Sequence, residues 1–103
     1  MKIYLAIPYS GNEEESFKFA NKIAGKLMSK GHIVFSPISH THPICKECEL
    51  PSEWKFWKQY DESFITWCDE VWICDFGNWA KSIGVKAEID IAIKLNKPIH
   101  FME

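Results

Sequence analysis

Glu88 is the residue whose type and position most clearly indicate chemistry. It lies in the segment 82–95 (SIGVKAEIDIAIKL), where apolar residues at spacings of three and four predict a helix. The predicted buried stripe consists of Val85, Ile91, Ala92 and Leu95. Glu88 falls on this stripe, although the opposite face already carries charged residues. Burying an unpaired carboxylate costs a free energy comparable to the whole stability of a small domain. We therefore expect Glu88 to have specific partners or to take part in a reaction.

Asp61 is a second acid of this kind. The segment 52–67 predicts a helix with Ser52 as its N-cap. Its predicted buried stripe consists of Trp57, Tyr60, Phe64, Ile65 and Cys68. Asp61 lies on this stripe, because it follows Trp57 by four residues and precedes Phe64 by three. One such acid can result from a wrongly assigned helix phase, but two on successive helices indicate a shared role.

Tyr4 adds a phenol to the same region. The segment 2–7 (KIYLAI) predicts a strand in which Tyr4 shares a face with Ala6. A phenol beside a small side chain leaves room for a ligand or for a partner carboxylate. The alternative is an ordinary core tyrosine whose hydroxyl is hydrogen-bonded elsewhere.

A histidine and cysteine cluster follows the second predicted strand. The residues His40, His42, Cys45 and Cys48 lie within one short segment, and four such ligands suit tetrahedral zinc. A structural zinc site usually joins two separated ligand pairs, so one compact loop is a poor source of all four. The preferred interpretation is that His40 or His42 contacts a substrate and that no metal is bound. A thioredoxin-type role is disfavoured, because that motif opens a helix directly after a strand.

These side chains must be brought together by the elements that carry them. Strands are predicted at 2–7, 32–36, 71–74 and 98–101, and helices at 16–30, 52–67 and 82–95, whereas 38–51 has no regular period and is expected to be a loop. Gly31 and Asn96 are expected to end the first and last helices. The alternation predicts a doubly wound, flavodoxin/Rossmann-like α/β fold. We expect three α/β/α layers around a mainly parallel four-stranded sheet of order 2-1-3-4.

The predicted strand order has a switch point between the first and third strands, and ligands of open α/β sheets bind beyond the carboxyl ends of strands at such a point. The segments expected there are 8–12, 39–51 and 75–84. Their candidate substrate contacts are Pro8, Tyr9, Ser10, His40, His42 and Asp75.

Composition excludes several classes of function. The chain has 103 residues, of which 47% are hydrophobic, so we expect one domain spanning residues 1–103 with a real core. A net charge of −2 without basic runs argues against nucleic-acid or membrane-surface partners. No apolar stretch approaches membrane-span length, and the N-terminal run is too short for a signal peptide. The cysteines are interpreted as reduced thiols of a cytoplasmic protein. No GxGxxG or Walker A motif occurs, so no cofactor is expected.

Several motifs together resemble one family. They are a tyrosine in the first strand (IYLA), Asp61 followed eight residues later by Asp69, and a closing run from Gly84 through Glu88 to Pro98. In order and spacing they resemble the nucleoside 2-deoxyribosyltransferase superfamily over nearly the whole chain. The segments PYS and PISHTHPI are similar to those of small bacterial and phage members.

The resemblance implies a role for each acid and for the phenol. Glu88 matches the nucleophile that attacks the anomeric carbon and forms a glycosyl–enzyme intermediate. Tyr4 matches the tyrosine that holds this carboxylate. Asp61 matches the acid that contacts the leaving base and helps to protonate it. Gly84 matches the glycine that opens the last helix.

Ser82 departs from the pattern of the transferases that act on free nucleosides, which usually have an aspartate six residues before the nucleophile. Related nucleoside 5′-monophosphate N-glycosidases have a serine there as a phosphate contact. A hydroxyl and free N–H groups at a helix N-terminus attract a phosphate, although Ser82 can also be an ordinary N-cap. Ser10, Gly11 and Asn12, before the first helix, are expected to supply a second set of donors. Relatives that borrow a residue from a neighbouring subunit continue beyond the position of Glu103, so that contribution is not carried over.

The resemblance thus implies cleavage of the N-glycosidic bond of a (deoxy)nucleoside 5′-monophosphate. Two alternatives stay open, namely base exchange between deoxynucleosides and a nucleotide-binding module without turnover. The middle of the chain is rich in aromatic residues, which could form the core, stack a base or cover a subunit interface. We expect a homodimer or a larger homo-oligomer.

Overall fold

The computed structural model describes residues 1–51, 53–75 and 79–102. Within them, four parallel strands form one sheet in the order β2-β1-β3-β4. The strands are β1 (Lys2–Ala6), β2 (Ile33–Phe35), β3 (Glu70–Cys74) and β4 (Ile99–Met102). Tyr4 of the central strand pairs with Phe35 on one side and with Val71 on the other. The predicted fold class and strand order are therefore confirmed.

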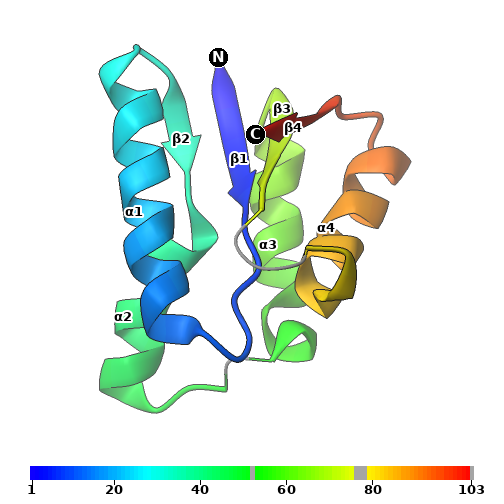
Figure 1. Cartoon of the computed structure of the whole chain (residues 1–103). Helices are drawn as coiled ribbons and strands as arrows, with labels where there is room; N and C mark the ends of the chain where they lie inside the picture. The colour runs from blue at the N-terminus through cyan, green and yellow to red at the C-terminus, as the bar shows by residue number, and fades with distance from the viewer. Residues whose placement is uncertain (52, 76–78, 103) are drawn as a thin grey trace.

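Helices cover both faces of this sheet (Figure 1). The first layer consists of α1 (Glu13–Ser29) and α2 (Pro37–Cys48), and the second of α3 (Trp54–Trp67) and α4 (Ile83–Lys94). A short 3-10 helix, η1 (Trp79–Lys81), precedes α4. Within the ranges described here, every helix is too short or too polar to cross a membrane.

The alternation of β1 divides the core into two clusters. Ile3, Leu5 and Ile7 face α1 and α2, where they pack with Ala20, Ala24, Leu27 and Ile38. Tyr4 and Ala6 face the opposite way and pack with residues from α3, β3 and α4. Both faces of a doubly wound parallel sheet are buried, which explains the nearly continuous apolar run of β1. The acids of interest lie on the second side.

Gly31 ends α1 as expected. Its φ of 94° lies in the left-handed region, which favours glycine. The N–H of Gly31 donates to the Met28 carbonyl at 3.0 Å and the N–H of His32 to the Leu27 carbonyl at 3.2 Å. These two bonds form a Schellman motif. Asn96, with a φ of 56°, ends α4 in the same way.

The expected loop at 38–51 is wrong, because most of this segment forms α2. Ser36 caps the helix by accepting the N–H of Ser39, and Pro37 occupies the first turn, where its missing N–H costs nothing. The inward residues Ile38, His42 and Cys45 do have helical spacing, but two of them are not aliphatic. The helical period was therefore hidden, and Pro43 reinforced the expectation of a loop.

Two expected buried stripes also need correction. Leu95 is 40% exposed, because it is the C-cap of α4 and leaves the stripe formed by Val85, Ile91 and Ala92. In α3, Asp61 and Ile65 are buried, whereas the three aromatic members Trp57, Tyr60 and Phe64 are only partly covered. These rings contact one another and Phe35, and Phe64 and Phe35 pack against the edge of the core.

Candidate active site

A cavity of about 230 Å³ lies beyond the carboxyl end of β1, where the predicted switch point placed a ligand site. The segment after β1 forms one wall, and α2, the start of α3 and the start of α4 form the others. The lining residues that can hydrogen-bond through their side chains are Tyr9, Ser10, Thr41, Cys45, Glu53, Trp54, Trp57, Asp61, Ser82 and Glu88. Among the described residues that line the cavity, three carry carboxyl groups and none is Lys, Arg or His.

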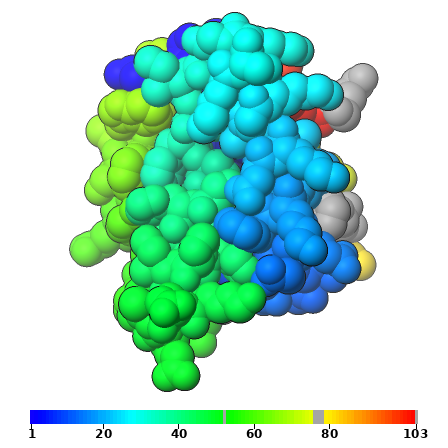
Figure 2. All heavy atoms as spheres, turned by 90° about the vertical axis from the view of Figure 1, so that its left-hand side faces the viewer, coloured from blue at the N-terminus to red at the C-terminus, as the bar shows by residue number. Residues whose placement is uncertain are grey.

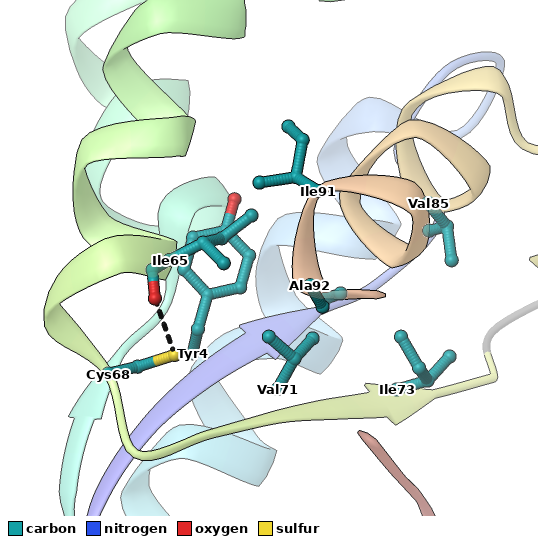
Figure 3. Close-up of a cluster of buried hydrophobic side chains, with 9 residues drawn as sticks. Tyr4, Ile65, Cys68, Val71, Ile73, Val85, Ile91 and Ala92 are labelled. Atoms are coloured by element: carbon teal, nitrogen blue, oxygen red, sulfur yellow. Dashed lines mark hydrogen bonds between the residues drawn. The ribbon is translucent and has the colours of Figure 1, made fainter. Parts of the chain in front are cut away.

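Glu88 and Tyr4 form the base of the site. Tyr4 is fully buried, and its hydroxyl donates a hydrogen bond to Oε2 of Glu88, which is 6% exposed. Figure 3 shows the Tyr4 ring rising from β1 into the space between α3 and α4. The contact joins the first strand to the last helix, which local sequence does not bring together. The specific partner expected for the buried Glu88 is therefore present, and one carboxylate oxygen faces the phenol.

Asp61 lies on α3 beside the same cavity. It is 7% exposed, and no hydrogen-bond partner reaches its buried Oδ1 among the residues that the structure describes. Burial raises the pKa of Asp61 from its ordinary value of 3.8 to about 7. An unpartnered polar atom that lines a cavity is positioned to bind a ligand rather than the protein.

The two acids influence each other. Burial raises the pKa of Glu88 well above its ordinary value, the charge of Asp61 raises it further, and the hydrogen bond from Tyr4 acts in the opposite direction. Burial and the adjacent Glu88 charge also raise the pKa of Tyr4, so the phenol keeps its hydrogen. One proton on Asp61 therefore favours ionisation of Glu88, and the pair can hold a carboxylate beside a carboxylic acid.

The N-terminus of α4 also lines the cavity. Ser82 is its N-cap, and Oγ accepts the N–H of Val85 at 3.2 Å, so its own hydroxyl hydrogen can point to a ligand. The N–H groups of Ile83 and Gly84 have no acceptor within the helix, because they belong to its first turn. A Cβ at Gly84 would lie 3.9 Å from the Trp54 ring, which is ordinary contact, so glycine is not needed there for space.

The loop after β1 contributes less than expected. Tyr9 and Ser10 line the cavity, whereas Pro8 does not. The N–H of Gly11 donates to Glu13 at 3.1 Å and the N–H of Asn12 to the Tyr9 carbonyl at 3.3 Å. The second set of free backbone donors is therefore absent at Gly11 and Asn12. The loop turns back on itself, and its Gly11 donor is taken up by Glu13 in the acidic first turn of α1.

The histidines do not line the cavity, contrary to expectation. His40 points to the opposite side of α2, where its ring stacks on Tyr60 at 6.0 Å. His42 is buried behind the cavity wall, between Phe17 and Tyr9. The two rings diverge, and Cys45 and Cys48 are free thiols. In the part of the chain that is described, no three His, Cys, Asp or Glu side chains form a group that could hold a metal ion.

Asp75 is placed outside the cavity as well. It is exposed, and its Oδ1 accepts the N–H of Trp79 at 3.0 Å, which caps η1. The rest of the expected loop at 76–78 lies outside the described residues. Sequence reasoning also missed lining residues on α2 and at the start of α3, namely Ile38, Thr41, Cys45, Glu53 and Trp54. Recognition of α2 as a helix would have indicated the first three.

Comparison with known proteins gives a consistent picture. Residues 1–103 match a family model with the description Domain of unknown function (DUF1937). The structure is similar to that of a 2-deoxyribosyltransferase from the psychrotolerant bacterium Bacillus psychrosaccharolyticus, a biocatalyst for nucleoside synthesis. The TM-score is 0.67 and the sequence identity 30%, over 98% of this chain and 71% of the other. None of the curated proteins compared with this chain matches it.

Proposed function

Because this chain belongs to the family Domain of unknown function (DUF1937) and is 2-deoxyribosyltransferase-like in fold, we propose that it cleaves the N-glycosidic bond of a nucleoside 5′-monophosphate. One observation carries the proposal. A buried carboxyl group hydrogen-bonded by a phenol, Glu88 with Tyr4, shares a cavity with Asp61, whose Oδ1 has no partner among the described residues. A nucleophile and a proton donor are what such a reaction requires.

In the first step, a Glu88 oxygen forms a bond to the anomeric carbon of the sugar. The bond from that carbon to the base nitrogen breaks, and its electron pair leaves with the base. Asp61 supplies the proton that the base takes up, and becomes a carboxylate. Tyr4 keeps its hydrogen bond to the other oxygen of Glu88, Oε2, and so orients the attacking oxygen.

In the second step, water attacks the anomeric carbon and its bond to Glu88 breaks. The proton of the water returns to Asp61, so both acids regain their starting states. The sequence of two displacements retains the configuration at the anomeric carbon, as in retaining glycosidases. If the nitrogen of a second base attacks in place of water, the same steps give base transfer.

The 5′-phosphate is assigned to the N-terminus of α4. Ser82 precedes Glu88 by six residues, which is about 9 Å along a helix axis and a suitable reach for the far end of a nucleotide sugar. The Ser82 hydroxyl and the N–H groups of Ile83 and Gly84 can donate to phosphate oxygens, and the helix dipole adds to this attraction.

A second candidate is a transferase that acts on free deoxynucleosides. The absence of cationic side chains among the described lining residues favours it, since Glu53, Asp61 and Glu88 repel a phosphate. The structural similarity to the 2-deoxyribosyltransferase from Bacillus psychrosaccharolyticus also supports this candidate.

The deciding experiment incubates the protein with a panel of nucleosides and their 5′-monophosphates and measures free base. We expect the monophosphate to be preferred in kcat/KM by about tenfold to a hundredfold for each phosphate hydrogen bond. Ser82→Asp should reverse this preference, because a carboxylate repels the phosphate and accepts a free 5′-hydroxyl. A wild-type preference for the unphosphorylated nucleoside would contradict the phosphate assignment and leave the second candidate.

A further inference from the structure

A chain of hydrogen bonds leads from the cavity to the surface behind it. The Tyr9 hydroxyl lies 2.6 Å from Nδ1 of His42, and Nε2 of His42 lies 3.0 Å from the Glu14 carboxylate. Lys46 donates to the same carboxylate at 3.5 Å. Tyr9 lines the cavity, whereas Glu14 and Lys46 are exposed. Figure 2 shows the face on which α1, in blue, and α2, in green, lie side by side.

His42 is held in one orientation within this hydrogen-bond chain. Its ring stacks on Phe17 with the centroids 4.6 Å apart and an angle of 28° between the planes. It also meets the edge of Tyr9 at an angle of 82°. Because the ring is buried and clamped, each nitrogen has one defined partner. The fixed geometry makes the hydrogen positions deducible from the partners.

The partners determine where the hydrogens lie when His42 is neutral. The Glu14 carboxylate can only accept, so Nε2 of His42 must carry the ring hydrogen and donate it. Nδ1 is then bare and accepts the hydrogen of the Tyr9 hydroxyl. The Tyr9 oxygen can therefore offer only lone pairs to the cavity. If His42 is protonated, Nδ1 donates to the Tyr9 oxygen, and the hydroxyl hydrogen is released to point elsewhere.

We propose that Tyr9 is a specificity-determining residue of this cavity and that Glu14 and His42 are positioning residues that fix the direction of its hydroxyl hydrogen. When His42 is neutral, the Tyr9 hydroxyl oxygen can only accept from the cavity, so it selects a substrate group that donates a hydrogen bond. On a nucleoside or nucleotide, that donor is a sugar hydroxyl or an amino group of the base. When His42 is protonated, the Tyr9 hydroxyl can donate its hydrogen into the cavity, and this selection is lost. The identity of the substrate rests on the function proposed above, whereas the hydrogen-bond chain does not.

The neighbouring charged and titratable groups keep the two ends of this hydrogen-bond chain, Glu14 and Tyr9, in defined protonation states. The hydrogen bond from His42 and the charge of Lys46 lower the pKa of Glu14, so this residue stays an acceptor over a wide pH range. Burial raises the pKa of Tyr9 to about 12, and Cys45, Glu13 and Glu14 act in the same direction. Tyr9 therefore keeps its hydrogen. Between these two ends, the His42 imidazole is the group that can gain a proton while both of its nitrogens keep their partners.

The first test needs no substrate. Nitrogen-15 NMR of the imidazole nitrogens reports which of them carries the hydrogen in neutral His42. We expect the hydrogen on Nε2 in the wild-type protein, and a mixture of both neutral forms in Glu14→Ala. Glu15→Ala removes the same charge from the same turn and should leave the wild-type pattern. A hydrogen on Nδ1 in the wild type, or the wild-type pattern in Glu14→Ala, would overturn the proposal.

The second test uses the best substrate of the panel above with two analogues. One analogue lacks the sugar 3′-hydroxyl and the other lacks the exocyclic amino group of the base. We expect the wild type to prefer the parent over one of them by roughly two- to tenfold in kcat/KM, the effect of one neutral hydrogen bond. The analogue that is rejected identifies the donor. Tyr9→Phe should abolish the preference, and Glu15→Ala should keep it.

The pH dependence separates positioning from mere support of the fold. The wild-type preference should decrease as His42 becomes protonated, and His42→Asn, which cannot titrate, should show a preference that does not change with pH. A preference that persists in Tyr9→Phe, or an unchanged pH profile in His42→Asn, would overturn the proposal. If no member of the panel is cleaved, the proposed function fails, and the NMR experiment still decides whether Glu14 sets the hydrogen position of His42.

Discussion

The two buried acids of the cavity differ in what surrounds them. Glu88 has a permanent hydrogen-bond donor in Tyr4, whereas a ligand is the available partner for Oδ1 of Asp61. This asymmetry suits different tasks, because a held carboxylate can attack and a free acid can donate its proton. Both residues are therefore expected to limit turnover, but for different reasons.

Glu88→Gln tests the attacking group. We expect base release to fall by about three orders of magnitude or more, since an amide does not form the glycosyl intermediate. The amide has the shape of the carboxyl and removes a buried ionisable group, so the melting temperature should hold or rise. Asp90→Asn, on the exposed face of the same helix, is the matched control and should change neither property. Near-normal activity of Glu88→Gln would eliminate the mechanism.

Asp61→Asn tests the second acid through the pH dependence of stability. The raised pKa means that the unfolded chain ionises at Asp61 from about pH 3.8, whereas the folded protein does so only near pH 7. Wild-type stability is therefore lost progressively across this window, and Asn removes that loss. One pKa unit corresponds to about 1.36 kcal/mol. Asp61→Asn should therefore raise the free energy of unfolding by roughly 4 kcal/mol at the top of this pH window.

Urea unfolding at several pH values measures this difference. The stabilisation by Asp61→Asn should be near zero at about pH 4, grow up to about pH 7 and then stay constant. Glu62→Gln on the exposed side of α3 is the control and should show no such growth. A constant difference between Asp61→Asn and wild type at all pH values would show that Asp61 is not desolvated in the folded protein.

The residue scale is also where sequence reasoning was most informative. An acid on an apolar stripe is conspicuous, so Glu88 and Asp61 could be recognised and their proximity inferred. The contact between Tyr9 and His42 could not be predicted. A partly buried tyrosine and a core histidine resemble ordinary packing residues until α2 is placed against α1. Most of the helices and strands followed from periodicity, although α1 begins at Glu13, three residues before the expected start at 16. The helix α2 was missed because two of its three inward residues named above are not aliphatic.

At the scale of elements, two glycines form a matched pair, one inside α1 and one just after its end. Gly31 has a φ of 94°, whereas Gly25 lies inside the helix, and a Cβ at either position would meet nothing within 4 Å. Gly31→Ala should destabilise by about 1–2 kcal/mol, since a side chain disfavours the left-handed region. Gly25→Ala should stabilise by about 0.5–1 kcal/mol through helix propensity. Chemical unfolding of both variants checks this, and equal signs would contradict the assigned end of α1.

For the whole molecule, self-association remains our expectation. Large apolar side chains are exposed along the α4 side, including Ile93 at 61% and Phe101 at 51%. Sedimentation velocity at micromolar concentration should give a mass above the 12.0 kDa of one chain. Ile93→Lys should shift the protein toward the monomer, whereas Met28→Lys on α1, an equally apolar exposed position, should not. A wild-type monomer would refute the expectation.

The central place of β1 affects how the protein can fold. β1 precedes the other strands of this sheet, yet it pairs with β3 some seventy residues later, in the register Ile3 with Glu70. The contact between Tyr4 and Glu88 spans 84 residues. Such a high contact order predicts slow folding compared with a helical bundle of similar size. β1 can pair with β2 early, but it gains its second neighbour only when residues 70–74 are present. The contact between Tyr4 and Glu88 can form only when α4 has docked as well.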